Sequence, residues 1–327
     1  MIDRRGFALG AVLGAALAPL ALRGAAGEAA WPDRLIRIIV PFAPGAFTDV
    51  SARLIAQELS EQLGQSVIVE NRGGAGGVMG TTAVVRAPPD GYTLLLSDTS
   101  LSISPGIYQN LGYDPLRDLA QISRVALAPS ILLVRPGLGP RTLSELIALA
   151  RQRPGEITFG SGGPGSSAHL GMELMLDVAG ISGQHVPFRG VAAAIAEVMA
   201  GRVDMTIASL AAGVAQVQAG ALLGLAVSAA ARSTLLPQVP TFAEAGLPAY
   251  KMMYWWGLAA PAGTPAEIIA RLNREVNRAC AAPRLREAFA QQAAIPAPSS
   301  PEEMHDLLAR EIVLWKGVIT RAKVSVQ

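Results

Sequence analysis

The residues best suited to chemistry lie in GSGGPGSSAHL, residues 160–170, where Ser166, Ser167 and His169 follow a glycine-rich stretch. A serine beside a histidine could act as a nucleophile, but the segment lacks GxSxG and no acidic partner is placed by the sequence. If a helix begins at these serines, its free N–H groups, its dipole and the two hydroxyls would favour an anion. We therefore favour anion binding over hydrolysis, with helix capping by Ser166 or Ser167 as the structural alternative.

Three other segments could supply groups of the same kind. FAPGAFTD, residues 42–49, contains Gly45, which lets the backbone approach a ligand, and Thr48, which offers a hydroxyl. NRGGAGGVMG, residues 71–80, could form an anion-binding nest, but it matches neither the P-loop nor GxGxxG, which argues against a nucleotide. SDTSLS, residues 97–102, places hydroxyls directly after an apolar run. Each segment alone could be an ordinary turn.

The surrounding pattern predicts that these segments follow buried strands. Residues 35–42, LIRIIVPF, form an apolar run of strand length, and apolar residues then recur at helical spacing from Val50 to Leu59 before Gly64. Strands alternating with helices predict a parallel, doubly wound sheet with both faces covered. In such sheets, ligands bind outside the carboxyl ends of the strands, where the polar segments are expected.

The alternation restarts after an apolar run at 125–134, which predicts a second α/β lobe. We expect lobe 1 to contain residues 31–130 plus 255–327 and lobe 2 to contain residues 131–254. The final helices, at about 265–281 and 301–321, are expected to fold back onto lobe 1.

Length, composition and charge agree with two lobes and exclude several classes of site. The 327 residues exceed what one core usually holds, about 250 to 300. Hydrophobic residues make up 51% and charged residues 16%, and the net charge of +2 without basic runs argues against a nucleic-acid partner. Cys280 is the only cysteine, so no internal disulfide can form, and three scattered histidines predict no metal site.

The first thirty residues have the pattern of a cleaved export signal. Arg4 and Arg5 precede an apolar run at 7–22, and small residues follow at 24–30. The apolar run is shorter than the roughly 20 residues that span a bilayer, so a permanent anchor is the weaker alternative. DRRGFAL, residues 3–9, resembles a twin-arginine signal, and the route stays open between twin-arginine and general secretion. We expect the mature protein in the periplasm.

Taken in order, segments along nearly all of the mature chain resemble the Bug family of extracytoplasmic solute receptors, the substrate-binding proteins of tripartite tricarboxylate transporters. The segments that carry the resemblance are WPDRLIRIIVPFAPGAFTDVSAR, VIVENRGGAGGVMGTTAVVRAPPDGYTLLL, YQNLGYDPLRDL, ITFGSGGPGSSAHLGMELM, HVPFRG, LLGLAVSAAARSTLLPQVPTFAEAGLP and GLAAPAGTPAEIIARLNREV. Each segment alone is modest, and their order is specific.

The resemblance implies an α/β, two-lobed periplasmic-binding-protein type II fold, in which each lobe is a mostly parallel sheet flanked by helices and two crossovers join the lobes. It implies a monomeric receptor without catalysis or cofactor, which encloses a small carboxylate and delivers it to membrane transporter subunits. A receptor that feeds a sensor protein is the alternative, and an exported serine hydrolase is a second one. Family ligands include dicarboxylates, tricarboxylates, acidic amino acids and aromatic acids.

The resemblance also implies which residues bind the ligand. The first strand-to-helix loop and the serine-rich helix start are expected to hold it from two sides, with further contacts from neighbouring loops. Carried onto this chain, the expected ligand-binding residues are Phe42, Ala43, Gly45, Ala46, Phe47, Thr48, Asp49, Thr99, Ser100, Ser161, Gly162, Ser166, Ser167, His169, Arg189, Gly190, Ala208 and Ser209.

Two departures from the family pattern bear on the ligand. The family usually has PGG in the first loop, whereas this chain has PGA followed by Phe47, which predicts extra bulk at the pocket mouth and an aromatic or alkyl carboxylate. The family often has Asp-Asn where this chain has Ala208 and Ser209. The missing acid argues against an amino-acid ligand. Asp49 is expected to cap a helix, because an acid would repel a carboxylate.

Overall fold

The computed structural model describes residues 31–325, so the expected export signal lies outside the described residues. No helix in the described part is long and apolar enough to cross a membrane. The first elements are β1 (Ile36–Val40), α1 (Phe47–Leu63), β2 (Val67–Asn71), the short 3-10 helix η1 (Ala75–Gly77), α2 (Val78–Val85), β3 (Thr93–Asp98) and α3 (Ser100–Ile107).

The middle and last parts of the chain continue the alternation of strands and helices. The middle elements are β4 (Leu119–Val134), η2 (Pro136–Leu138), α4 (Leu143–Gln152), β5 (Thr158–Ser161), α5 (Ser167–Ala179), β6 (Gln184–Pro187), α6 (Val191–Met199), β7 (Met205–Ser209), α7 (Leu210–Gln218) and β8 (Leu223–Val227). The last elements are β9 (Met253–Pro261), α8 (Ala266–Ala281), α9 (Pro283–Gln291), β10 (Ile295–Pro296) and α10 (Pro301–Ala322).

The strands form one continuous sheet in the order β2-β1-β3-β9-β4-β7-β5-β6, with β8 and β10 also paired to β4. Parallel pairing joins β2, β1 and β3, and it joins β7, β5 and β6. The long strand β9 pairs antiparallel with β3 and β4, and β4 pairs antiparallel with β7. The alternation of strands and helices in the sequence predicted the two parallel groups. It did not predict the antiparallel strands between them, where β4 runs from the first group to the second and β9 runs back.

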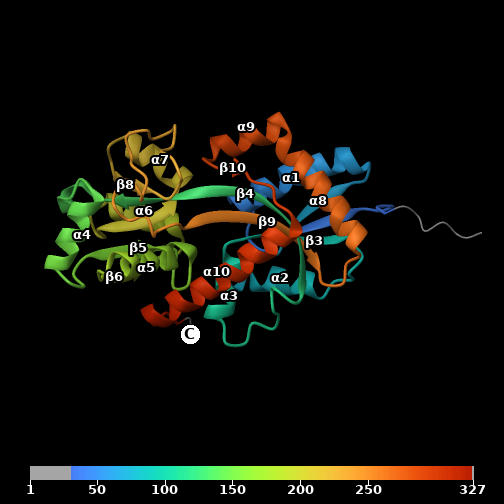
Figure 1. Cartoon of the computed structure of the whole chain (residues 1–327), viewed down its shortest axis with the longest axis horizontal. Helices are drawn as coiled ribbons and strands as arrows, with labels where there is room; N and C mark the ends of the chain where they lie inside the picture. The colour runs from blue at the N-terminus through green and yellow to red at the C-terminus, as the bar shows by residue number, and fades with distance from the viewer. Residues whose placement is uncertain (1–30, 326–327) are drawn as a thin grey trace, which may run out of the picture.

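Strand β4 changes partners along its length. Residues 119–129 pair with β9, and residues 130–134 pair with β7 and β8. Figure 1 shows β4 and β9 running side by side between two groups of helices. Through this change of partners, β4 contacts both groups of elements.

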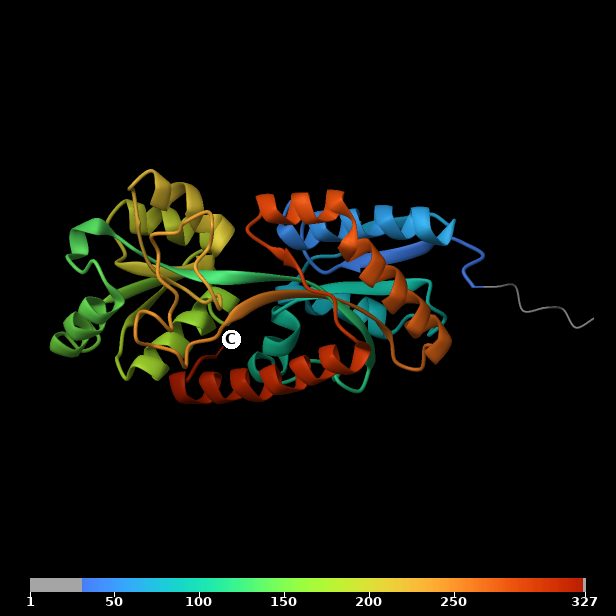
Figure 2. The same cartoon turned by 45° about the horizontal axis from the view of Figure 1, so that its top comes forward.

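Helix α10 contributes to both groups, although the sequence pattern placed it with lobe 1. Met304, Leu308 and Ile312 pack in a core with β3 and β9, whereas Trp315 and Val318 pack in the core that contains α5. The 22 residues reach about 33 Å at 1.5 Å per residue, which is long enough to contact both cores. Figure 2 shows α10 lying along the underside of both groups.

Glu311 fixes the middle of α10 to β9 and to α3. Its Oε2 accepts hydrogen bonds from Trp255 Nε1 at 2.7 Å, from the Ser102 hydroxyl at 2.8 Å and from Trp315 Nε1 at 3.4 Å. Burial raises the pKa of Glu311, and the three donors lower it in part. Since α3 also lines the cavity described below, this contact helps to position the candidate site.

We expect Glu311→Ala to lower the free energy of unfolding by about 3 kcal/mol, because two buried indole N–H groups lose their acceptor at once. Urea unfolding followed by circular dichroism measures the change. Asp306→Ala, an exposed acid on the same helix, is the control and should stay within about 0.5 kcal/mol of the unchanged protein. Equal stability of the two variants would mean that Glu311 does not fix α10.

Candidate functional site

A cavity of about 320 Å³ lies between the two groups of elements, and we refer to it as the inter-lobe cavity. Five of the expected ligand-binding residues line it: Phe42, Ser100, Gly162, Ser166 and Ser167. The sequence reasoning did not single out the other lining residues, which are Gly76, Asp98, Ile103, Ser104, Ile107, Tyr108, Pro164 and Gly165.

The lobe 2 side of the cavity is the start of α5. Ser166 is the N-cap residue, and its hydroxyl accepts a hydrogen bond from the His169 N–H at 3.2 Å. The capping alternative is therefore confirmed for Ser166, which also lines the cavity. Helix geometry leaves the first N–H groups of α5 without intrahelical acceptors. These groups, with the Ser167 hydroxyl, form a partly positive wall that suits an anion.

The lobe 1 side is helix α3, which the sequence reasoning treated as a loop. Pro105 lies inside α3 and hides its helical pattern, since proline normally ends a helix. Ser100, Ile103, Ser104 and Ile107 occur at spacings of three and four, so they share one face, and that face lines the cavity. This spacing is the signal that could have found them.

Tyr108 joins the end of α3 to the glycine-rich loop. Its hydroxyl donates a hydrogen bond to the Ala75 carbonyl at 2.9 Å. A Cβ at Gly76, where φ is +61°, would lie 3.0 Å from that same hydroxyl. The glycine at this position therefore permits close packing of the loop against Tyr108 at the edge of the cavity.

Asp98, at the end of β3, brings an acid to the inter-lobe cavity. Its Oδ2 accepts a hydrogen bond from the Thr48 hydroxyl at 3.1 Å, and its Oδ1 accepts one from the Ser100 N–H at 3.0 Å. Trp256 Nε1 donates to the Thr48 hydroxyl at 3.0 Å. Thr48, which we expected to contact the ligand, is buried and bonds Asp98 instead. Burial raises the pKa of Asp98.

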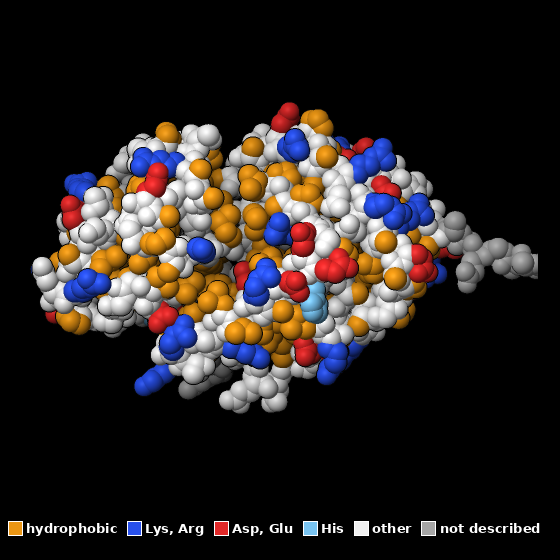
Figure 3. Space-filling model, viewed as in Figure 1, with side chains coloured by type: hydrophobic (Ala, Val, Ile, Leu, Met, Phe, Trp, Pro, Cys, Tyr) orange, Lys and Arg blue, Asp and Glu red, His pale blue; other side chains and the backbone are white. Residues whose placement is uncertain are grey.

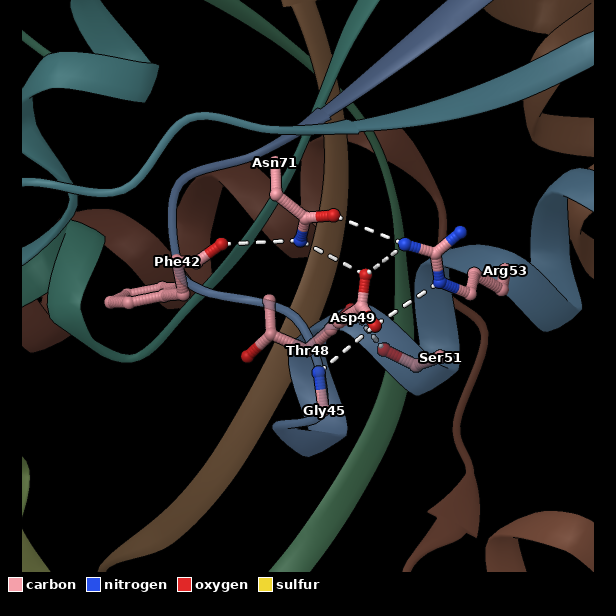
Figure 4. Close-up of polar contacts among 7 residues, drawn as sticks. All are labelled: Phe42, Gly45, Thr48, Asp49, Ser51, Arg53 and Asn71. Carbon is pink, nitrogen blue, oxygen red and sulfur yellow. Dashed lines mark hydrogen bonds and ion pairs between the residues drawn. The ribbon is translucent and has the colours of Figure 1, made fainter.

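Asp49 holds the loop between β1 and α1 in place through hydrogen bonds (Figure 4). Its Oδ2 accepts hydrogen bonds from the Gly45 N–H and from Arg53 Nε, both at 3.1 Å, and its Oδ1 accepts one from Asn71 Nδ2 at 2.9 Å. Asn71 Nδ2 also donates to the Phe42 carbonyl at 3.1 Å. Burial raises the pKa of Asp49, but these donors outweigh burial and hold the pKa below its usual value. Asp49 therefore positions the loop and does not line the cavity.

The expected narrowing of the pocket mouth by Phe47 is wrong. The Phe47 ring centroid lies 4.3 Å from that of Trp256 and 5.2 Å from that of Phe289, in edge-on contacts. Phe47 is the first residue of α1, and its side chain packs on the core beneath that helix. Ala43, Gly45 and Ala46 are exposed and do not line the cavity either.

Two stacked histidines brace the serine loop of lobe 2. The His169 and His185 rings stack with centroids 3.7 Å apart. The Gly165 N–H donates to His169 Nδ1 at 3.1 Å, and the Ser161 hydroxyl lies 2.6 Å from His185 Nε2. The Ser166 hydroxyl bonds the backbone of His169 and not its ring, so the Ser166–His169 pair that the sequence suggested for a serine hydrolase is not formed. His169 is a positioning residue.

The remaining expected residues lie outside the cavity wall. Thr99 is buried, and its hydroxyl accepts a hydrogen bond from the Trp255 N–H at 3.2 Å. Ala208 is buried in β7, and Ser209 pairs with Ser130 of β4. Arg189 and Gly190 are exposed, although Gly190 lies directly against Gly162, where a Cβ would be 3.4 Å from it.

A larger cavity of about 810 Å³ lies beside β4 and β9 and is lined by residues of α9, β10 and the segment after β8. Figure 3 shows hydrophobic side chains around the notch between the two groups of elements on this face. Its walls are mainly aliphatic, and Lys251 is the only charged residue that lines it. Because aliphatic walls do not offset the desolvation of a carboxylate, we place the candidate anion site in the inter-lobe cavity.

The histidine pair predicts a pH dependence of stability. Burial, with the charge of His169 as a second cause, lowers the pKa of His185 to about 4. An unfolded histidine has a pKa near 6.5, so the unfolded chain binds the extra proton first, and stability falls as the pH drops from about 6.5 to 4. We expect this histidine to account for a loss on the order of 2 kcal/mol, after allowance for solvent screening.

Thermal unfolding of His185→Gln between pH 7.5 and 4 should therefore show a shallower loss of stability than the unchanged protein. His305→Gln, on the exposed side of α10, controls for the loss of a histidine as such. If His185→Gln and the unchanged protein lose stability in parallel, His185 does not titrate in this range.

Comparisons with known proteins show which proteins this chain resembles. Residues 51–324 match the family model described as the tripartite tricarboxylate transporter family receptor. The chain is 39% identical over 319 residues to Protein BugT of Bordetella pertussis, which covers 96% of this chain and 98% of that protein. Apart from Phe42, the residues that line the inter-lobe cavity lie within residues 51–324.

Two solved structures of similar proteins carry ligands. R. palustris Rpa4515 with adipate is 35% identical, with a TM-score of 0.78, over 90% of this chain and 100% of that chain. MatC from Rhodopseudomonas palustris with bound malate is 31% identical, with a TM-score of 0.74, over 88% of this chain and 99% of that chain. These likenesses, with that to the periplasmic binding protein BugD, confirm the expected α/β periplasmic-binding-protein fold.

Proposed function

The chain belongs to the tripartite tricarboxylate transporter receptor family, and on this premise we propose that its inter-lobe cavity captures one small carboxylate for a membrane transporter. The protein is a periplasmic solute-binding receptor and not an enzyme. The proposal adds where the ligand binds, which groups hold it and what receives it.

The observation that carries the proposal is the start of α5, where Ser166 and Ser167 line the cavity and the first N–H groups, apart from that of His169, lack intrahelical acceptors. None of the residues that line the inter-lobe cavity is a lysine, arginine or histidine, so a carboxylate there would depend on hydrogen bonds. A hydrogen bond to a charged group contributes about 1.5 to 3 kcal/mol, and several together can offset desolvation. Adipate and malate in two relatives support a small carboxylate as the ligand class.

Closure of the two lobes gives the mechanism of capture. Residues from lobe 1, such as Ser100, and from lobe 2, such as Ser167, line the same cavity. A ligand that contacts both sides binds the closed form more tightly and shifts the population toward it. The closed receptor is then the form that a transporter would recognise. We also propose that residues 1–30 are cleaved on export and that the receptor is a monomer.

A thermal-shift screen identifies the probe for quantitative work. Adipate, malate, succinate, citrate, glutamate and benzoate cover the main classes of small carboxylate. A ligand that binds only the folded state raises the melting temperature, by an amount that grows with its concentration relative to Kd. A rise with one class would name the ligand class. No rise with any acid, in protein shown to be folded and ligand-free, would contradict carboxylate capture.

We expect Ser167→Glu to weaken binding of the strongest acid from that screen at least tenfold. The new carboxylate would take the anion's place at the start of α5 and would repel it. Isothermal titration calorimetry measures Kd. Ser182→Glu, an exposed serine after α5, adds the same charge away from the cavity and should leave Kd within twofold. Unchanged affinity in Ser167→Glu would remove the start of α5 from the site.

A further inference from the structure

Asp98 is an acid with unused acceptor capacity in the wall of the inter-lobe cavity. Its oxygens accept hydrogen bonds only from neutral donors, the Thr48 hydroxyl and the N–H and side chain of Ser100. A carboxylate has about four lone-pair sites, so acceptor capacity remains for a donor on the ligand. Trp256 Nε1 donates to the oxygen of the Thr48 hydroxyl, and that hydroxyl donates its own proton to Asp98. Thr48 is therefore not available as an acceptor for a donor group of the ligand.

No cation balances Asp98 in the part of the chain that the structure describes. The groups that shift its pKa are burial, Ser100 and Thr48, and none of them is charged. None of the lining residues is basic. Asp49, by contrast, lies outside the cavity and forms an ion pair with Arg53 at 2.9 Å. A buried acid without a partner is costly, and a cation brought by the ligand would remove that cost.

The two ends of the cavity therefore have opposite polarity. The start of α5 is partly positive, and Asp98 on the facing lobe is the only acid in the wall. Asp98 and the serines at the start of α5 line the same cavity of about 320 Å³, so one small ligand can contact both ends.

We propose that Asp98 is a specificity-determining residue that receives the ammonium group of a small amino carboxylate, whose carboxylate binds at the start of α5. A zwitterion matches both ends of the cavity, whereas a dicarboxylate would bring a second negative charge to Asp98. The inference rests on the proposed function, because it assigns the other end of the same cavity. It reverses the expectation against an amino-acid ligand that was drawn from Ala208 and Ser209.

Matched ligand pairs test the proposal on the unchanged protein. Succinate and 3-aminopropanoate share one spacer, as do glutarate and 4-aminobutyrate, and adipate and 5-aminopentanoate. Alanine and propanoate test an ammonium group beside the carboxylate. Calorimetry at pH 7.5 should give a Kd at least tenfold lower for the amino carboxylate in one or more pairs. Tighter binding of the acid without an amino group in every pair would overturn the role of Asp98. The proposal that the protein is a carboxylate receptor would still stand.

The variant Asp98→Asn then assigns the effect to this residue. The amide keeps an acceptor and the shape of the side chain but loses the charge, so the preferred amino carboxylate should bind at least tenfold more weakly. The affinity for the matched dicarboxylate should stay the same or increase. Asp306→Asn, an exposed acid on α10, is the control and should change neither. Equal affinity of Asp98→Asn and the unchanged protein for the amino carboxylate would overturn the proposal.

Failure of the inference and failure of the proposed function have different signatures. If the dicarboxylates bind in the inter-lobe cavity more tightly than every matched amino carboxylate, Asp98 does not select an ammonium group and only the inference fails. If no acid of either kind binds to protein with a normal melting curve, carboxylate capture fails and the role of Asp98 fails with it.

Discussion

The geometry of the site depends on the pairing of one strand. Residues 119–129 of β4 pair with β9, and residues 130–134 pair with β7 and β8, so one strand belongs to both lobes. This arrangement brings α3 and the start of α5 to the same cavity, although they lie more than fifty residues apart in the sequence. Helix α10 packs against both α3 and α5.

Most of the side chains that attract attention in the sequence support the cavity and do not line it. Asp49 ties the first loop to Arg53 and Asn71, and the stacked His169 and His185 brace the serine loop. Backbone N–H groups and hydroxyls are then left to meet the ligand. Groups held in place beforehand lose little entropy on binding, which favours affinity without a buried basic residue.

The sequence predicted the local features well, because strand, cap and glycine signals depend on neighbouring residues. The apolar run at 35–42 contains β1, and Ser166 caps α5. It did not predict α3, because Pro105 masks the helix, or the inward packing of Phe47. Asp98 was missed because its setting depends on Thr48 and Trp256, which are 208 residues apart and meet only in the folded chain.

A crystal structure with the tightest-binding acid tests the account most directly, since it locates the ligand as well as showing that one binds. The account predicts carboxylate oxygens within hydrogen-bonding distance of the first N–H groups of α5 and the Ser167 hydroxyl, with the lobes closed over them. Ligand density in the larger aliphatic cavity beside Lys251, with the inter-lobe cavity empty of it, would contradict the account.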